Sequence, residues 1–316
     1  MAEQGEKILH LPCRLGEITF WSPALRLWVY RAGLFEGASE AEVTERVRAE
    51  ARRRDGAFLN SLRVSEGRAG LSLRNGFLRY VPQHDDRYVI DLSGSFDDYM
   101  TGFATKTRST LRRKIRRFER EAGGELDVRE YRSRDELADF LGSARTVSAQ
   151  SYQEIMLDAG LPDSDTFSAE ALANAEAGQC RGYLLFFEGR PVAYMYCPVR
   201  DGVARYAYVG YDQEFASLSP GTVLLLNVLE RLHDDPDIHT FDFLEGGDEG
   251  SHKAFFANRR LSCTNVFLLR PTPRNSAIVL VHAASRRLSR GLARTLDRLG
   301  LKQRIRQAIR RVRPAR

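Results

Sequence analysis

The chain has 316 residues, of which 43% are hydrophobic, which is enough for one large packed domain or two smaller ones. No stretch approaches about eighteen uninterrupted apolar residues, which argues against a membrane-spanning helix. The first residues carry acids ahead of any apolar run, which argues against a secretory signal peptide.

Four widely spaced cysteines form no CxxC pair: Cys13, Cys180, Cys197 and Cys263. This spacing predicts reduced thiols in a cytoplasmic protein, with no metal site and no disulfide framework.

The net charge of +6 is unevenly distributed along the chain. Residues 271–316 carry thirteen Lys or Arg against one acid, Asp297, which leaves residues 1–270 with a net charge of −6. Residues 106–120 form a second basic cluster, with eight Lys or Arg against Glu119. Two local basic surfaces on an acidic body predict localised anionic partners.

The first part of the chain predicts one helix and several short strands. The helix covers about residues 40–54, and strands are expected near 57–64, 70–74 and 76–81. Ser95 is suited to cap a short helix, and a basic helix follows from about Lys106, with Leu111, Ile115 and Phe118 on one stripe. Gly123 and Gly124 are expected to end it.

The second part of the chain alternates between the two periods. Strands are expected at residues 126–131, 182–187, 192–199, 204–211, 240–244 and 264–269, and helices at 135–150, 168–177 and 220–233. Gly246-Gly247 breaks the strand near 240–244, and Asp248 is expected to cap a short helix running to about Asn258. We therefore predict an α/β (α+β) fold with a mixed, mostly antiparallel sheet flanked by helices.

The stretch SLSPGT predicts a helix start that could bind an anion. Ser219 is placed as N-cap, Pro220 as first helical residue, and Gly221 leaves room for a close approach. The N–H groups of Leu218, Gly221, Thr222 and Val223 would then be free for a pyrophosphate. An ordinary capped helix without a ligand is the competing interpretation.

Four segments resemble one protein family in the right order. In chain order they are FDDYMTGFATKTRSTLRRKIRRFERE, RPVAYMY, YVGYDQEFASLSPGTVLLLNVLE and FDFLEGGDEGSHKAFF. They are similar to the FemAB-like branch of GNAT acyltransferases, and most similar to the acetyltransferases associated with cellulose and exopolysaccharide synthesis. The resemblance covers about Asp91 to Arg270, and the family's first half is shortened here. It divides the chain into residues 1–90, 91–270 and a basic helical tail, 271–316.

The resemblance implies an acyl-CoA co-substrate and an amine or hydroxyl acceptor on a sugar or amino-acid-like molecule. Backbone groups of the strand Tyr208, Val209, Gly210 and Tyr211, with Gly210 permitting a bulge, would hold the thioester carbonyl. Leu218, Ser219, Gly221 and Thr222 take the place of the family's phosphate loop, although that loop is richer in Gly and Arg.

Three side chains near the strand tip are candidates for catalysis. Asp242 could accept the acceptor's proton or hold a sugar hydroxyl, Lys253 could stabilise negative charge, and His252 could act as acid or base. The alternatives are a capping role for Asp242 and a surface position for His252. As a catalytic residue, Asp242 would be replaceable by Asn with little loss of stability.

Two alternative functions and two possible surfaces remain open at this stage. The chain could be a tRNA-dependent aminoacyl ligase of the FemAB type, or a GNAT-like module without activity. The basic helix 106–120 could bind CoA phosphates, a nucleotide-activated sugar or RNA, or could be a solvated face. Residues 286–316 predict contact with an anionic membrane surface on the cytoplasmic side, and packing of their leucines on the enzyme is the alternative.

Overall fold

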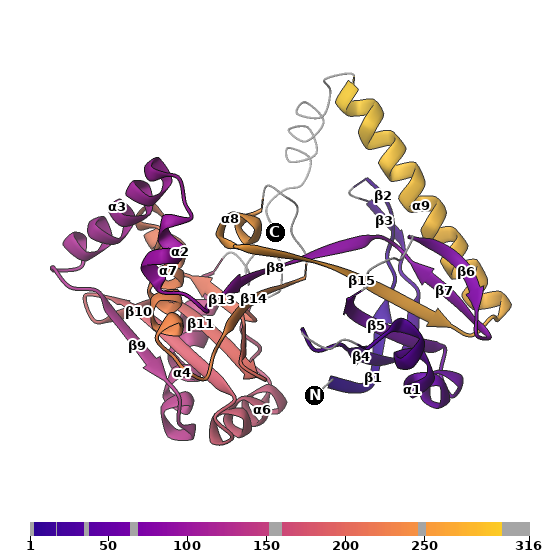
Figure 1. Ribbon diagram of the computed structural model, residues 1–316, viewed down its shortest axis with the longest axis horizontal. Coiled ribbons are helices and arrows are strands. Elements are labelled where there is room, and N and C mark those ends of the chain that lie inside the picture. Colours follow the sequence, from indigo (N-terminus) through magenta and orange to yellow (C-terminus); the bar gives the residue numbers. More distant parts are fainter. Residues whose placement is uncertain are drawn as a thin grey trace. The chain divides into compact units, whose positions relative to one another are not determined.

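The computed structural model describes residues 3–16, 18–34, 38–63, 69–151, 160–245 and 251–298 (Figure 1). The chain forms two compact units. Unit 1 comprises Met1–Asp85 and Ser262–Arg316, and unit 2 comprises Asp86–Leu261. The sequence-based boundaries at residues 90 and 270 differ from this grouping, because the last strand and the helix that follows it belong with the first 85 residues.

Unit 1 is a sheet with a helix on each face. Its elements are β1 (Glu3–His10), β2 (Cys13–Leu15), β3 (Ile18–Trp21), β4 (Ala24–Arg31), α1 (Glu40–Arg52), β5 (Gly56–Arg63), β6 (Gly70–Arg74), β7 (Phe77–Val81), most of β15 (Arg259–Leu269) and α9 (Pro273–Arg298). The strand order of this sheet is β1-β4-β5-β15, and β7 also pairs with β15. Among the described residues of this sheet, β4 and β5 form the only parallel pair. A separate hairpin joins β2 and β3.

Two apolar clusters hold unit 1 together. Val43, Val47 and Ala51 of α1 pack on one side of the sheet, because they recur at helical spacing. Ile278 and Val279 of α9 pack on the other side. The first part of the predicted tail is therefore a helix whose apolar residues contribute to the core, while residues 299–316 lie outside the described residues.

Unit 2 has the predicted mixed, mostly antiparallel sheet flanked by helices. Its elements are β8 (His84–Asp91), α2 (Phe96–Thr101), α3 (Thr105–Glu121), β9 (Asp127–Tyr131), α4 (Arg134–Ala149), α6 (Asp165–Glu176), β10 (Cys180–Phe187), β11 (Arg190–Arg200), β12 (Val203–Arg205), β13 (Tyr208–Tyr211), η1 (Gln213–Leu218), α7 (Pro220–His233), β14 (Thr240–Glu245) and α8 (His252–Phe256). The strand order of its sheet is β8-β14-β12-β11-β10-β9. Among the strand pairs that the structure describes in this unit, β12 and β14 form the only parallel one.

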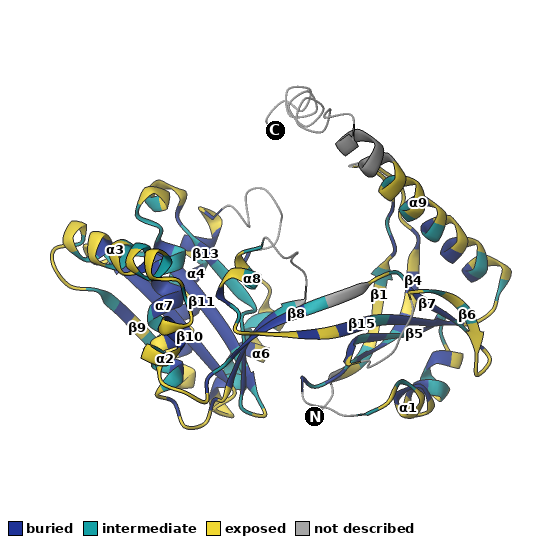
Figure 2. Cartoon of the chain, turned by 45° about the horizontal axis from the view of Figure 1, so that its top comes forward, coloured by how far each residue is buried: buried dark blue, intermediate teal, exposed yellow. Residues whose placement is uncertain are grey.

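The central strands β10 and β11 of unit 2 are buried on both faces (Figure 2). Alternate residues of β10 point to opposite sides, so Tyr183 and Leu185 pack with α7 and α3, whereas Leu184 and Phe186 pack with α4. The predicted stripe on α3 is confirmed, because Leu111 and Phe118 are buried, while the outer face of this helix is exposed.

Several sequence predictions of local structure need correction. The strand expected at residues 204–211 is two strands, β12 and β13, with different partners. The last short helix begins at His252 and is capped by Ser251, whose hydroxyl accepts from the Ala254 N–H. Gly246, Gly247 and Asp248 lie outside the described residues. The strands at residues 3–31 and β8 were not predicted.

Two absences concern only the described part of the chain. No helix there is both long and apolar enough to cross a bilayer. No cluster of metal-ligating side chains occurs there either. The four cysteines are free thiols, and all four are buried.

Candidate active site

The site begins between β12 and β13, where the chain stops following β14. β12 pairs with β14, and the Tyr206 N–H still donates to the Asp242 carbonyl oxygen at 2.9 Å. β13 then follows β11, from Tyr208 opposite Tyr196 to Tyr211 opposite Ala193. No described strand pairs with the edge of β13 that faces away from β11.

The alternating hydrogen bonds between β11 and β13 determine in which direction each N–H group of β13 points. The Asp212 N–H donates to the Val192 carbonyl oxygen at 2.9 Å. In an antiparallel pair every second residue faces its partner strand, so Gly210 also bonds toward β11. The N–H groups of Val209 and Tyr211 are therefore directed away from β11, toward the unpaired edge.

Gly210 serves close packing. A Cβ at this position would lie 2.6 Å from Cε1 of Tyr194 and 3.0 Å from Cβ of Ser151. The β11–β13 register runs through Gly210 without a shift, so the predicted bulge is wrong. The glycine lets Tyr194 lie flat across the strand, where the Tyr194 hydroxyl donates to Ser148 Oγ at 3.1 Å.

The start of α7 supplies a second backbone feature. Ser219 is the N-cap, but it is left-handed (φ 58°) and its side chain makes no capping bond. Its carbonyl oxygen instead accepts from the N–H groups of Thr222 and Val223, at 3.0 and 3.1 Å. The prediction that these two N–H groups are free is therefore wrong. The Gly221 N–H has no partner among the described residues, and a Cβ there would lie 3.2 Å from Cδ1 of Tyr211.

A cavity of about 400 Å³ lies between β13 and the start of α7. Seven predicted site residues line it: Val209, Gly210, Tyr211, Ser219, Gly221, Thr222 and His252. This volume is within the range of small-molecule sites. Residues separated by up to about forty positions thus meet at one surface.

His252 stands at this cavity on the short helix α8. Its ring lies 4.7 Å from the ring of Phe256, centroid to centroid, and 6.4 Å from that of Phe243. Although part of the side chain reaches solvent, desolvation by these neighbours lowers the pKa of His252, and the positive charge of Lys114 lowers it further. His252 is therefore neutral at pH 7 and can accept a proton.

Lys253 is half-buried on the same helix and does not line the cavity. It has an interaction partner within the protein.

Asp242 does not line the cavity either, because it forms a buried ion pair in the sheet. Both Asp242 and Arg87 are fully buried, and Arg87 Nε donates to the two carboxylate oxygens at 2.9 and 3.0 Å while Nη2 also donates to Oδ2. The Leu244 N–H donates to Oδ1 at 2.9 Å. With its oxygens engaged in this way, the carboxylate links β8 to the tip of β14.

The remaining predicted residues pack beside the cavity. Tyr208 faces the α4 side of the sheet, with its ring 5.1 Å from that of Phe167, and Leu218 packs against the α7 cluster. Sequence reasoning missed five lining residues: Tyr194, Met195, Tyr206, Ala216 and Leu224. Met195 and Tyr194 could have been found from the antiparallel pairing of 192–199 with 204–211.

Tyr206 is the chemically relevant residue among these five. Its ring contacts Phe241 and Phe243 at 5.7 and 5.3 Å between centroids. Burial raises the pKa of Tyr206 well above its usual value, so its hydroxyl stays protonated and can donate a hydrogen bond.

Comparison with known proteins places this arrangement in a known fold. Residues 105–253 match the family model of the acetyltransferase (GNAT) domain. The protein has a GNAT-like fold. No curated protein shows significant sequence similarity to the chain.

Three solved structures agree with this fold. The C-terminal domain of a putative lysylphosphatidylglycerol synthetase from Agrobacterium fabrum is 13% identical, with 83% of this chain and 84% of that one covered and a TM-score of 0.54. L-PGS from Bacillus licheniformis is 15% identical (84% and 85% covered, TM-score 0.51), and FemX is 10% identical (87% and 91% covered, TM-score 0.51). At these identities the likeness concerns the fold.

The GNAT-like fold raises the question of whether the cavity suits an acyl-CoA. The unpartnered Gly221 N–H and the N–H groups of β13 that are directed away from β11 are donors suited to carbonyl oxygens. A side chain at position 221 would meet Tyr211 and narrow the space. No Arg or Lys of the described ranges lines the cavity, so these residues fit the acyl-bearing end of the molecule, and its phosphates would need basic groups outside the cavity.

Proposed function

We propose that the protein transfers an acyl group from acyl-CoA to an amine or hydroxyl of a sugar or amino-acid-like acceptor. The observation that carries this proposal is the cavity beside β13, where backbone N–H groups and a neutral histidine face the same space. Acyl transfer needs donors for the carbonyl oxygen and a base for the attacking group.

Each group in the cavity has a place in this reaction. One of the two outward N–H groups, that of Val209 or that of Tyr211, donates to the acyl carbonyl oxygen as negative charge develops on it, and the other is available to a carbonyl oxygen further along the CoA arm. His252 accepts the proton of the acceptor as the new bond to the acyl carbon forms. Tyr206 donates a hydrogen bond to the departing thiolate, and the proton that His252 accepted passes to this sulfur, which balances the transfer.

The acceptor class and setting belong to the same proposal. We infer a saccharide or amino-acid-like acceptor, used in envelope or exopolysaccharide synthesis, from the resemblance of residues 91–270 to acetyltransferases of that kind. Buried thiols that form no disulfide suit a cytoplasmic location, where acyl-CoA is supplied.

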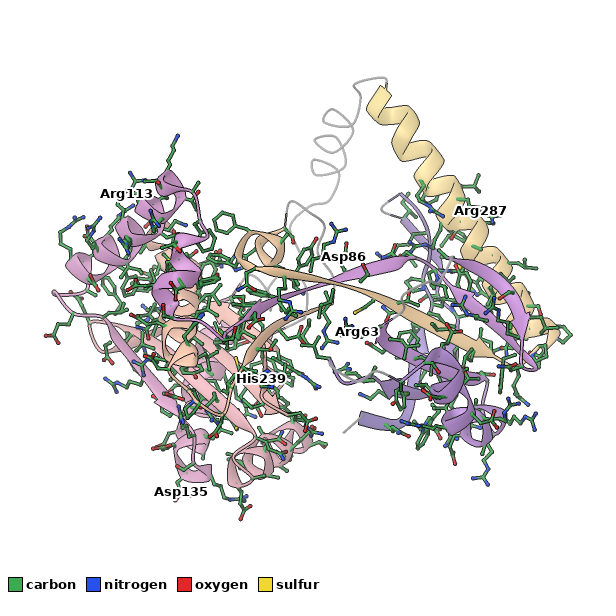
Figure 3. All side chains as sticks on the ribbon, in the orientation of Figure 1. Arg63, Asp86, Arg113, Asp135, His239 and Arg287 are labelled. Atoms are coloured by element: carbon green, nitrogen blue, oxygen red, sulfur yellow. The ribbon has the colours of Figure 1, made fainter. Side chains whose placement is uncertain are left out.

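An aminoacyl-tRNA donor is the second candidate. It is favoured by the outer face of α3, which exposes five arginines: Arg112, Arg113, Arg116, Arg117 and Arg120. Arg113 projects from this helix into solvent (Figure 3). A face of this kind attracts the phosphates of RNA as well as those of CoA.

Calorimetry separates these candidates. The full chain is titrated with acetyl-CoA, with longer acyl-CoAs and with an aminoacyl-tRNA. Sub-millimolar acyl-CoA binding is expected, whereas tRNA binding without acyl-CoA binding supports the second candidate, and binding of neither supports a module without activity. Tyr206→Phe, which keeps the ring contacts with Phe241 and Phe243, is expected to bind acyl-CoA normally and to turn over more slowly.

A further inference from the structure

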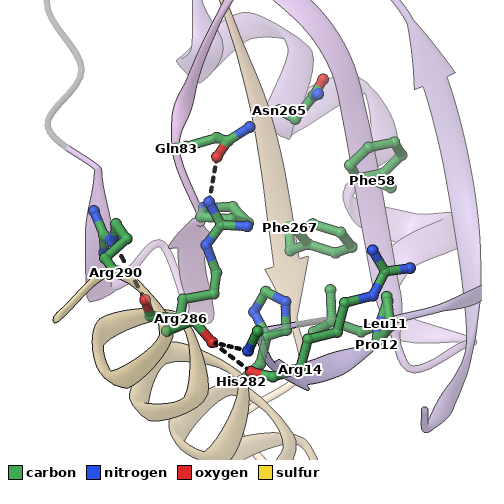
Figure 4. Close-up of a pocket in the computed structure, with 13 residues that line it drawn as sticks. Leu11, Pro12, Arg14, Phe58, Gln83, Asn265, Phe267, His282, Arg286 and Arg290 are labelled. Carbon is green, nitrogen blue, oxygen red and sulfur yellow. Dashed lines mark hydrogen bonds between the residues drawn. The ribbon is translucent and has the colours of Figure 1, made fainter. Parts of the chain in front are cut away.

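Unit 1 contains a cavity that the proposed reaction does not use. It has a volume of about 470 Å³ and lies between the β2–β3 hairpin, the sheet and α9 (Figure 4). Its apolar wall is formed by Leu11, Phe58 and Phe267. Phe58 and Phe267 pack against each other with ring centroids 4.6 Å apart, so this wall is a fixed surface.

Three arginines line the same cavity: Arg14, Arg286 and Arg290. None of them forms an ion pair with a carboxylate in the described part of the chain. Arg286 donates from Nη2 to Gln83 Oε1, while its Nε is buried and has no hydrogen-bond partner. An unpaired guanidinium N–H at a cavity of uncompensated positive charge indicates an anionic ligand.

The remaining titratable groups at the cavity do not offset this charge. His282 is buried, and the Tyr80 hydroxyl lies 2.7 Å from its Nδ1. Burial lowers the pKa of His282 to about 4, so the ring is neutral at pH 7. The positive charge of the cavity therefore comes from its arginines.

The hairpin next to the cavity exposes an apolar surface. Ile18 and Phe20 of β3 are 71% and 57% exposed, and Leu15 and Trp21 are also exposed. The hairpin is fastened to α9 because the Gly16 N–H donates to Ser289 Oγ at 3.2 Å and Ser289 Oγ donates to the Arg14 carbonyl oxygen at 2.8 Å. Leu288, on the adjoining turn of α9, is 63% exposed. Exposed apolar side chains thus lie on the same hairpin and helix that form the arginine cavity.

We propose that this part of unit 1 binds an anionic bilayer, with a lipid phosphate in the arginine cavity and the β2–β3 hairpin in the interface. Guanidinium groups bind phosphate oxygens in pairs, and Trp, Phe and Ile side chains are stable at the boundary between headgroups and acyl chains. Charge complementarity selects an anionic surface, because basic residues near such a surface each contribute to binding. The proposal is independent of the acyl-transfer reaction.

The test is sedimentation of the full-length protein with vesicles of phosphatidylcholine, and with vesicles of phosphatidylcholine mixed with phosphatidylglycerol. Binding to the anionic vesicles is expected. Arg286→Gln/Arg290→Gln should weaken it about thirtyfold, because each arginine near an anionic surface contributes on the order of 1 kcal/mol. Phe20→Ser should weaken it without changing the charge.

The matched control is Arg113→Gln/Arg117→Gln on α3, which removes the same charge from exposed positions of unit 2. It should bind the vesicles like the wild type. Equal losses in both double variants would mean that only total charge matters, and no vesicle binding by the wild type would also overturn the proposal. Inorganic phosphate tests whether the ligand of the cavity is a free phosphate and not a lipid headgroup. If inorganic phosphate binds in the cavity while the arginine variants keep full vesicle binding, the bilayer is not the partner. Circular dichroism confirms that each variant is folded.

Discussion

At the level of single residues, the proposed reaction uses His252 as its base. Desolvation and Lys114 both favour its neutral form, so the pKa lies below the ordinary value of about 6.5. A general base must be neutral to act, and its activity is lost as the pH falls through its pKa. A base of this kind works unimpaired at neutral pH.

We expect His252→Gln to lower kcat by about a hundredfold or more while acyl-CoA affinity stays unchanged. In the wild type, kcat/KM should fall as the pH is lowered through a pKa below about 6.5, and this limb should be absent in the variant. Kinetics across pH with one acyl-CoA and one amine acceptor check both points. A variant that keeps the wild-type limb would show that another group is the base.

The second residue-level prediction concerns Asp242. Because this carboxylate compensates the buried charge of Arg87, Asp242→Asn removes the negative charge that faces the Arg87 guanidinium in the core. We expect a loss of about 3–5 kcal/mol in the free energy of unfolding. This differs from the expectation that a catalytic carboxylate can be replaced with little effect on stability.

The double variant Arg87→Met/Asp242→Leu is the control, because it removes both charges at once. Buried ion pairs replaced by apolar residues often lose little stability, so urea unfolding should place it above the single variant. If it also kept acyl transfer, Asp242 would act only in the sheet.

At the level of elements, we expect the start of α7 to decide how closely acyl-CoA can approach the backbone of the cavity. Gly221→Val would push a branched side chain against Tyr211 and cover the unpartnered N–H group. We expect acyl-CoA affinity to fall at least about tenfold, with little change in acceptor KM. Gly142→Ala is the matched control, since a Cβ there meets nothing within 4 Å. Unchanged affinity in Gly221→Val would place the carrier elsewhere.

How much of these elements was predictable depends on the range of the interactions that form them. Pro220 and the leucines that follow it define α7 locally, and the sequence placed both of its ends correctly. The separation of β13 from β12 depends on pairing with β14, and the Arg87–Asp242 pair joins residues 155 positions apart. Local patterns contain neither. Strand β3 was missed because all four of its residues are exposed, so no alternation marks it.

At the level of the whole molecule, the two units have separate apolar cores. Leu59 is fully buried in a cluster of unit 1, and Leu225 is fully buried in the largest cluster of unit 2. A Leu→Ala change at a fully buried site costs about 2–5 kcal/mol. We expect calorimetric unfolding to show two transitions, with Leu59→Ala lowering one and Leu225→Ala the other. One transition lowered equally by both variants would mean that the units unfold together.

The burial of all four thiols has a practical consequence for measuring catalysis. Thiol reagents attack thiolates, and burial raises the pKa of Cys13 and Cys197 and brings that of Cys180 to about 11. The folded protein should therefore react slowly with an aromatic disulfide that colours on reduction. Free CoA carries an exposed thiol and reacts at once, so each turnover can be followed continuously in the presence of the intact enzyme.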